Sequence, residues 1–396
     1  MPILKIVTSF LFVCFTLNFP LLGQVIELGP AIHRDQSIVT VAVQSSQKNL
    51  EALAKKAFSL HGRFLVDTVG SSALTLRFEP SGEDGVLLRI QEKGGKEQVR
   101  KVRGTNLENA VLRACDLVVE WSTGLEGFFA GKLAFVAKRS GVSEVYVSNL
   151  LFSDVRALTS DRSFVTGPSW SPDGMRLLYT SYHKSGFPDI YKIDLLAGVR
   201  SPVASYKGTN TGGRFSPNGQ QIAMVLSGTG NSELWVSEKD GSKRRRLTNN
   251  SSLEASPTWS PDGQRLVFTS DQAGRPQLYE ISVSGGPMRR LRTQVSRYCA
   301  EPTWNPVHAD QIAFTAAVSG GFQLFLYDAK NRSSRQLTRG PGDALEACWL
   351  NDGRHLVYTQ RRGGQTKLML LDTVSGKTAA LHRPSVGDTS SASFAY

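Results

Sequence analysis

Residues whose types could support catalysis are scattered along this chain, without the spacings that catalysis needs. Ser375-Gly376-Lys377-Thr378 ends like a phosphate-binding loop, but position 371 is Leu where such a loop requires Gly. The sequence holds no Gly-x-Ser-x-Gly, His-Glu-x-x-His or Cys-x-x-Cys motif, and its six His do not cluster. We therefore expect no catalytic residues, no metal site and no cofactor.

Recognition of another protein is a better use of the polar and aromatic side chains that collect between predicted strands. Such side chains supply the oriented contacts of protein interfaces when rigid elements hold them in loops. The candidates for partner binding are Thr209, Asn210, Glu254, Arg297, Tyr298, Glu301, Asp343 and Glu346.

A repeat supplies the elements that would bring these loops together. An aromatic residue recurs at intervals of 44 or 45 residues, and in several copies a Ser-Pro-Asp-Gly-like turn and an apolar strand follow it. A period in the forties with four short strands per unit is typical of a β-propeller blade. The aromatic positions are Trp170, Phe215, Trp259, Trp304, Trp349 and Phe394.

The register of the copies predicts how the ring closes. The first apolar second strand, at Leu133, has no aromatic strand before it, and the last aromatic copy, Phe394, has no strands after it. We therefore expect Ala392–Tyr396 to supply the innermost strand of the blade that begins at Leu133, which would remove open sheet edges. The predicted fold is all-β, a six-bladed β-propeller preceded by a small α/β domain, with the candidate loops gathered at one mouth of the channel.

The N-terminal third divides into three segments. Residues 1–23 carry a Lys and an apolar run that is typical of a signal peptide cleaved near Gly23. Residues 24–36 form an extension, and residues 37–127 predict a small α/β domain. In it we expect strands near 38–43, 74–78, 86–90 and 98–102, and a helix over Lys48–Leu60. A second helix opens with the capping box Thr105-Asn106-Leu107-Glu108. Residues 128–396 are the predicted propeller.

The net charge and the number of cysteines further limit the class of protein and its possible partners. The formal charge of +12 comes with a basic cluster, Lys243-Arg244-Arg245-Arg246, that lacks interleaved aromatic residues. We interpret it as a solvated strand edge, which favours acidic protein partners or an anionic envelope surface over nucleic acid. Once the signal peptide is removed, three cysteines remain, and we expect no disulfide between Cys299 and Cys348.

The order of these segments and several motifs resemble the TolB family of the Tol–Pal envelope system. The resemblance covers nearly the whole mature chain. It is carried by the run Phe268–Gln277, by Glu301-Pro302-Thr303-Trp304 before a blade, and by the domain junction Leu117–Val136.

The resemblance implies a periplasmic scaffold that performs no reaction. Family members bind the peptidoglycan-associated lipoprotein Pal through the propeller mouth, and they communicate with the inner-membrane protein TolA to maintain the envelope during division. Thr209 and Asn210 fall in the family's Pal-contacting loop, with Thr209 where the family has His, and Arg297–Glu301 form the neighbouring loop. The TolA-binding segment corresponds to Val25, Ile26, Glu27 and Leu28. The alternative from another class is a secreted propeller enzyme, either a glycan lyase or a peptidase relative.

Overall fold

The computed structural model describes residues 37–139 and 141–396. The predicted signal peptide, the extension 24–36 and the TolA-like segment 25–28 lie outside the described residues. The α/β domain and the propeller belong to one compact unit, Ala31–Tyr396. Within the described ranges, no helix has both the length and the apolarity needed to cross a bilayer.

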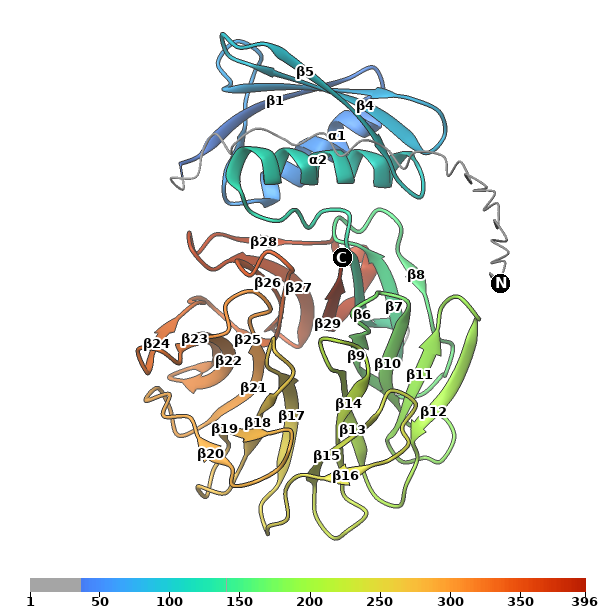
Figure 1. Cartoon of the computed structure of the whole chain (residues 1–396), viewed down its shortest axis with the longest axis vertical. Helices are drawn as coiled ribbons and strands as arrows, with labels where there is room; N and C mark the ends of the chain where they lie inside the picture. Colours follow the sequence, from blue (N-terminus) through green and yellow to red (C-terminus); the bar gives the residue numbers. More distant parts are fainter. Residues whose placement is uncertain (1–36, 140) are drawn as a thin grey trace, which may run out of the picture. The chain divides into compact units, whose positions relative to one another are not determined.

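The α/β domain is a five-stranded sheet with two helices (Figure 1). The four predicted strands and both helices are present, and the sheet order is β2-β1-β3-β4-β5. The additional strand β2 spans only three residues, too short for alternation to reveal it. The elements are β1 (Val39–Ser45), α1 (Lys48–Leu60), β2 (Phe64–Val66), β3 (Leu74–Pro80), β4 (Gly85–Glu92), β5 (Glu97–Arg103) and α2 (Leu107–Thr123).

The predicted capping box of α2 was wrong by one residue. The N-cap is Asn106, whose side chain accepts the backbone N–H of Asn109 at 2.8 Å. Asn109 Oδ1 in turn accepts the N–H of Thr105 at 3.1 Å. Asn is as good an N-cap as Thr, and here the pair Asn106 and Asn109 replaces the expected pair Thr105 and Glu108.

The propeller consists of six four-stranded antiparallel sheets within residues 132–395 (Figure 1). In five of the six sheets the outermost strand is shorter than the innermost one, and three of the outermost strands contain only two residues. Five blades are consecutive in sequence: β9 (Val165–Trp170), β10 (Arg176–Ser181), β11 (Asp189–Asp194), β12 (Val199–Ala204); β13 (Asn210–Phe215), β14 (Gln221–Leu226), β15 (Glu233–Glu238), β16 (Arg245–Arg246); β17 (Glu254–Trp259), β18 (Arg265–Ser270), β19 (Gln277–Ser282), β20 (Arg289–Arg290); β21 (Cys299–Trp304), β22 (Gln311–Val318), β23 (Gly321–Asp328), β24 (Ser333–Gln336); β25 (Asp343–Trp349), β26 (His355–Arg362), β27 (Gln365–Asp372), β28 (Thr378–Ala380).

The sixth blade joins the two ends of the propeller, as predicted. The C-terminal strand β29 (Asp388–Ala395) pairs with β6 (Lys132–Arg139), followed by β7 (Val142–Asn149) and β8 (Arg156–Ala157). Figure 1 shows the dark red closing strand beside the green β6. The closing strand begins four residues earlier than the predicted Ala392 and ends at Ala395.

The aromatic repeat positions form the core between blades. Trp259 is buried and packs with Leu266 and Tyr279 of its own blade and with Val225 of the preceding blade. Its indole Nε1 donates to the carbonyl of Arg214 at 3.0 Å. One large side chain per repeat therefore both fills the space between neighbouring sheets and fixes their separation.

Candidate protein-binding mouth

The propeller presents exposed aromatic and aliphatic side chains at the end where its innermost strands begin, which we call the mouth. Because successive strands of a blade alternate in direction, the loops that connect the second and third strands lie at this end too. Phe164 and Phe187 are 59% and 63% exposed. Exposed apolar side chains gathered on one surface mark sites of protein contact. The others at the mouth are Tyr182, Tyr206, Leu253 and Tyr298.

Four of the predicted partner-binding residues have accessible side chains in the mouth loops. Arg297 and Tyr298 are exposed, and the ring of Tyr298 lies edge-on to that of Phe322 at 5.3 Å. Thr209 is half-buried. Asp343 is also half-buried, and it forms an ion pair with Arg361 at 2.7 Å. Arg361 offsets the negative charge of this carboxylate at the rim.

Asn210 and Glu254 were predicted on the same grounds but are buried, with 0% and 1% exposure. The Asn210 amide donates to the carbonyls of Pro188 and Tyr206 and so holds its own loop in place. Glu254 accepts the hydroxyl of Ser270 at 2.9 Å. Burial raises the pKa of Glu254 to about 7, and the nearby carboxyl of Glu233 adds to the rise. In this conformation both side chains lie buried under the mouth loops and hold those loops in place.

A ring of backbone kinks surrounds the channel just inside the mouth. In each blade one innermost-strand residue has a left-handed φ of 51° to 69°, and the strand pairing shifts register there. Such bulges bend the strand and re-aim its side chains. Four of these residues are not glycine, so their conformation carries strain that the ring must hold. They line a cavity of about 370 Å³ and are Gly167, Gly212, Ser256, Glu301, Glu346 and Ser391.

Glu301 and Glu346 were predicted as partner contacts, and the structure places them in this ring as braces between blades. Glu301 Oε2 accepts the backbone N–H of Glu346 at 3.1 Å and the hydroxyl of Thr315 at 2.8 Å. Glu346 Oε2 accepts the backbone N–H of Ser391 at 2.9 Å. Each carboxylate therefore satisfies the strained backbone of the next blade. Burial raises the pKa of Glu301, and the negative charge of Glu346 adds to the rise.

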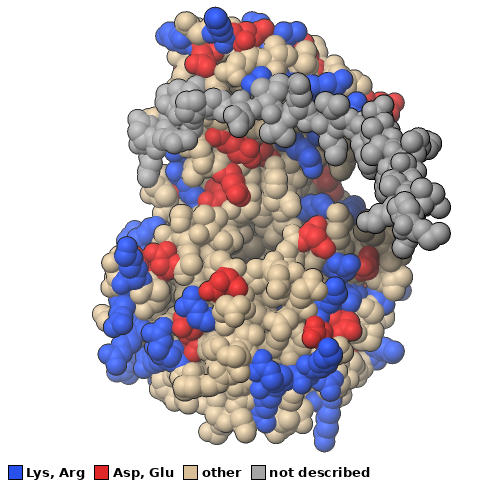
Figure 2. Space-filling model, viewed as in Figure 1, with Lys and Arg blue, Asp and Glu red and all other residues tan. Residues whose placement is uncertain are grey.

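Three side chains of the basic cluster 243–246 form contacts within the fold. Arg244 lies over the ring of Tyr206 at 3.8 Å, and Arg246 forms an ion pair with the buried Glu233 at 2.7 Å. Arg245 donates to the carbonyl of Val283. Figure 2 shows that Lys and Arg gather mainly toward the outer rim of the propeller on the face drawn. Lys243, Arg244 and Arg245 are exposed, as expected of a solvated strand edge, whereas Arg246 is half-buried.

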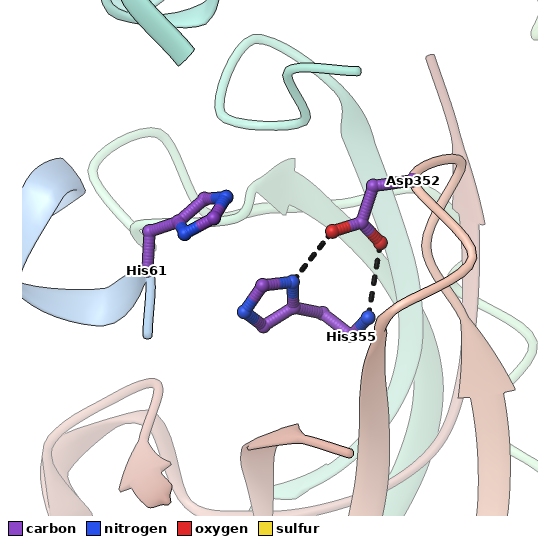
Figure 3. A group of neighbouring side chains, drawn as sticks. All are labelled: His61, Asp352 and His355. Atoms are coloured by element: carbon purple, nitrogen blue, oxygen red, sulfur yellow. Dashed lines mark hydrogen bonds and ion pairs between the residues drawn. The ribbon is translucent and has the colours of Figure 1, made fainter. Parts of the chain in front are cut away.

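Among the described residues, only one group of three potential ligand side chains could hold a metal ion. One ligand atom from each of His61, Asp352 and His355 lies within 4.8 Å of the others, and all three residues are buried (Figure 3). Both oxygens of Asp352 already accept hydrogen bonds from His355, from its backbone N–H at 3.0 Å and from Nδ1 at 2.6 Å. No sequence motif marks this group, because His61 and His355 belong to different domains.

Comparisons with known proteins agree with the propeller fold described above. The family model described as the TolB β-propeller domain matches residues 119–307. The Tol–Pal system protein TolB of Bordetella pertussis and that of Bordetella bronchiseptica are each 32% identical to the chain over 211 residues, 52% of this chain and 48% of each relative. The chain thus spans about half the length of the curated relatives it matches. The crystal structure of TolB from Acinetobacter baumannii aligns with a TM-score of 0.81 over 92% of this chain and 98% of that one, at 21% identity, which shows the fold. Residues 119–307 of this chain are therefore similar to the TolB β-propeller domain, and the whole described fold is that of the Acinetobacter TolB structure.

Proposed function

We propose that the chain is a periplasmic scaffold of a Tol–Pal type system that binds a Pal-like outer-membrane lipoprotein through the mouth. The observation that carries the proposal is the set of exposed apolar side chains around the mouth, led by Phe164, Phe187 and Tyr298. Apolar side chains supplied by rigid loops lose little conformational entropy on binding and are frequent hot spots of protein interfaces.

The mouth is also free of the chain's own second domain. The α/β domain contacts turns at the opposite end of the blades, where Lys56 Nζ donates to the carbonyl of Leu151 and Lys377 Nζ donates to that of Ser59. A partner at the mouth and a partner at the α/β domain could therefore be bound at the same time. This separation suits a protein that links two other proteins.

Within the mouth, we assign direct contact to Arg297, Tyr298, Thr209 and Asp343 because their side chains are accessible. Asn210 and Glu254 contribute by holding the loops, and Glu301 and Glu346 by bracing the channel. Coupling to a TolA-like inner-membrane protein through residues 25–28 is proposed from the family resemblance of the sequence. Its test is the deletion of that segment followed by a binding measurement with the TolA-like domain.

The proposal includes no catalytic step. Among the described residues that line the channel, Glu301 and Glu346 are acidic, and both accept hydrogen bonds from neighbouring blades, which gives them a role in the fold. Turnover of a peptide or polysaccharide panel by the purified chain, lost on replacing either Glu with Gln, would favour the enzyme alternative instead.

The binding test uses the purified mature chain and the soluble domain of a Pal-like lipoprotein from the same organism. We expect the double variant Arg297→Ala/Tyr298→Ala to bind at least about tenfold more weakly by calorimetry, as for the loss of hot-spot contacts. The control is Leu196→Ala, since Leu196 is 80% exposed in a turn at the opposite end of the propeller. Absence of binding by the wild type, or equal affinities of the two variants, would refute the proposed site.

A further inference from the structure

A groove rich in arginine lies between two neighbouring blades, the one formed by β17–β20 and the one formed by β21–β24. Its volume of about 1160 Å³ exceeds the range of about 300–1,000 Å³ that is usual for small-molecule sites. No Asp or Glu is among the described residues that line it. The arginines that line it are Arg289, Arg290, Arg292, Arg297 and Arg332.

Two of these arginines have a use within the fold. Arg289 forms an ion pair with Glu280 at 3.2 Å, and Arg290 donates to the side-chain oxygen of Gln277 at 2.8 Å. Both belong to β20, the outermost strand of its blade. Positive side chains on such a strand protect its open edge from pairing with other chains. Edge protection therefore accounts for Arg289 and Arg290.

The other three arginines lie outside the strands, where edge protection does not explain them. Arg292 and Arg297 belong to the loop that follows β20, and Arg332 belongs to the turn before β24. All three are exposed, and within the described part of the chain none of them forms an ion pair or a side-chain hydrogen bond. Like charges that line one groove without a counter-ion repel one another. An anion bound between them would relieve that repulsion.

The two walls of the groove are joined before any ligand binds. Ser334 Oγ, on β24, donates to the carbonyl of Thr293 at 2.8 Å, which links the loop after β20 to the next blade. Gln294 and Arg332, one on each wall, have left-handed φ values of 55° and 53°. Strained backbone of this kind gathers at binding sites. Walls that are already ordered lose little conformational entropy on binding.

Apolar side chains lie between the arginines. Leu291 and Tyr327 are buried, and Met288 and Val295 are half-buried. All four line the groove. The surface therefore combines free guanidinium groups with an apolar floor, which suits a ligand that carries both anionic and apolar groups.

We propose that this groove binds an extended acidic segment of a protein partner. Its Asp or Glu side chains pair with Arg292 and Arg332, since a guanidinium group can donate two parallel hydrogen bonds to one carboxylate. Its apolar side chains lie on the floor. A flat bilayer surface does not enter a groove that two blades enclose, and this favours a peptide chain over anionic lipid.

The groove is distinct from the mouth, although the loop after β20 supplies both Arg297 here and Tyr298 there. Arg292 and Arg332 take no part in the contacts assigned to the mouth. Replacing these two residues therefore tests the groove alone, and the result does not depend on which partner the mouth binds.

The test is the binding of a blocked peptide of about ten residues, in which Glu and Ala alternate, to the purified mature chain at low ionic strength, where charge pairing is least screened. We expect Arg292→Gln/Arg332→Gln to bind this peptide at least about tenfold more weakly than the wild type by calorimetry. Lys93→Gln/Lys96→Gln is the control, because it removes the same charge from an exposed turn of the α/β domain. Its affinity should stay within about twofold of the wild type, since net charge alone acts weakly at that distance.

Absence of peptide binding by the wild type, or equal affinities of the two double variants, would overturn the proposal. Sedimentation with phosphatidylglycerol vesicles is the second measurement. If the wild type binds the vesicles but not the peptide, and Arg292→Gln/Arg332→Gln no longer binds them, the groove recognises a lipid surface and the proposal is wrong. Equal unfolding midpoints of the two variants in urea would confirm that the fold is intact, as expected for side chains that form no contacts.

Discussion

Glu346 joins the last repeat of the propeller to its closing strand through Ser391. One carboxylate oxygen accepts the backbone N–H of Ser391 at 2.9 Å, and the other accepts its hydroxyl at 2.9 Å. Ser391 is one of the strained residues of the channel ring, with a φ of 53°. The ring therefore closes through a charged acceptor as well as through the pairing of β29 with β6.

Replacing Glu346 by Gln should weaken this closure. The amide oxygen can still accept the backbone N–H of Ser391 and the amide nitrogen can donate to its hydroxyl, but both bonds lose the negative charge that strengthens them. Hydrogen bonds to charged groups contribute about 1.5–3 kcal/mol each, and we expect the free energy of unfolding in urea to fall by about that amount. Glu83→Gln removes an exposed charge and is the control. Equal unfolding midpoints for the two variants would contradict the bracing role.

Gly62→Ala should disturb the junction of the two domains without straining the backbone. The new Cβ would lie 1.8 Å from Asp372 Oδ2, and Asp372 cannot easily move because Arg354 holds both of its oxygens. Overpacking of this kind costs about 1–3 kcal/mol. We expect a lower free energy of unfolding together with faster hydrogen exchange at residues 61–64. Destabilisation without a change in exchange at these residues would argue against a tight contact.

Glu254→Gln should stabilise the chain at high pH only. Because burial raises the folded-state pKa of Glu254 from 4.5 to about 7, the folded state holds the proton more tightly between these values. The stability that Glu254 contributes is fully present below pH 4.5 and is lost as the pH rises through 7. Gln mimics the protonated form, so we expect it to be about 1–2 kcal/mol more stable than the wild type at pH 8.

Denaturant unfolding at pH 8 and pH 4.5 checks this expectation for Glu254, with Glu83→Gln again as the control. The difference between Glu254→Gln and the wild type should vanish near pH 4.5, where both side chains are neutral. A variant less stable than the wild type at pH 8 would show that the ionised carboxylate is required.

The parts of the fold that local chemistry determines could be predicted from the sequence. Trp259 and its counterparts mark each blade because every interface between sheets needs a large apolar side chain at the same place. The closing strand could be predicted from the register of the same repeat. The N-cap of α2 is Asn106 and not the predicted Thr105. Both residue types are good N-caps, and only the backbone conformation decides between them.

Features that depend on the assembled ring could not be predicted. Glu301 and Glu346 read as polar loop residues, and nothing in their types indicates a left-handed φ, which usually signals Gly. Asn210 and Glu254 read the same way, but the adjacent blade buries them. His61 and His355 meet only because the α/β domain packs on the turn that precedes β26, a choice that no repeat or periodicity encodes.

The C-terminal residue Tyr396 links the propeller to the α/β domain. The hydroxyl of Tyr396 donates to Asp116 Oδ2 at 3.0 Å, beside the N–H groups of Phe129 and Ala130 that Asp116 also accepts. Tyr396→Phe removes one of three donors to a buried carboxyl whose pKa burial raises to about 7. Above that pH the carboxylate is charged and needs the donor most.

We therefore expect Tyr396→Phe to lower the free energy of unfolding by about 1.5–3 kcal/mol at pH 8, where the acceptor is charged, and by about 1 kcal/mol or less at pH 5.5. Tyr182→Phe, which removes the hydroxyl of an exposed tyrosine at the mouth, should have no effect at either pH. Urea unfolding of the three proteins at both values measures the difference. An equal loss at the two pH values would mean that the Tyr396 hydroxyl does not sense the charge of Asp116, and no loss at all would mean that the closing strand is held by its pairing with β6 alone.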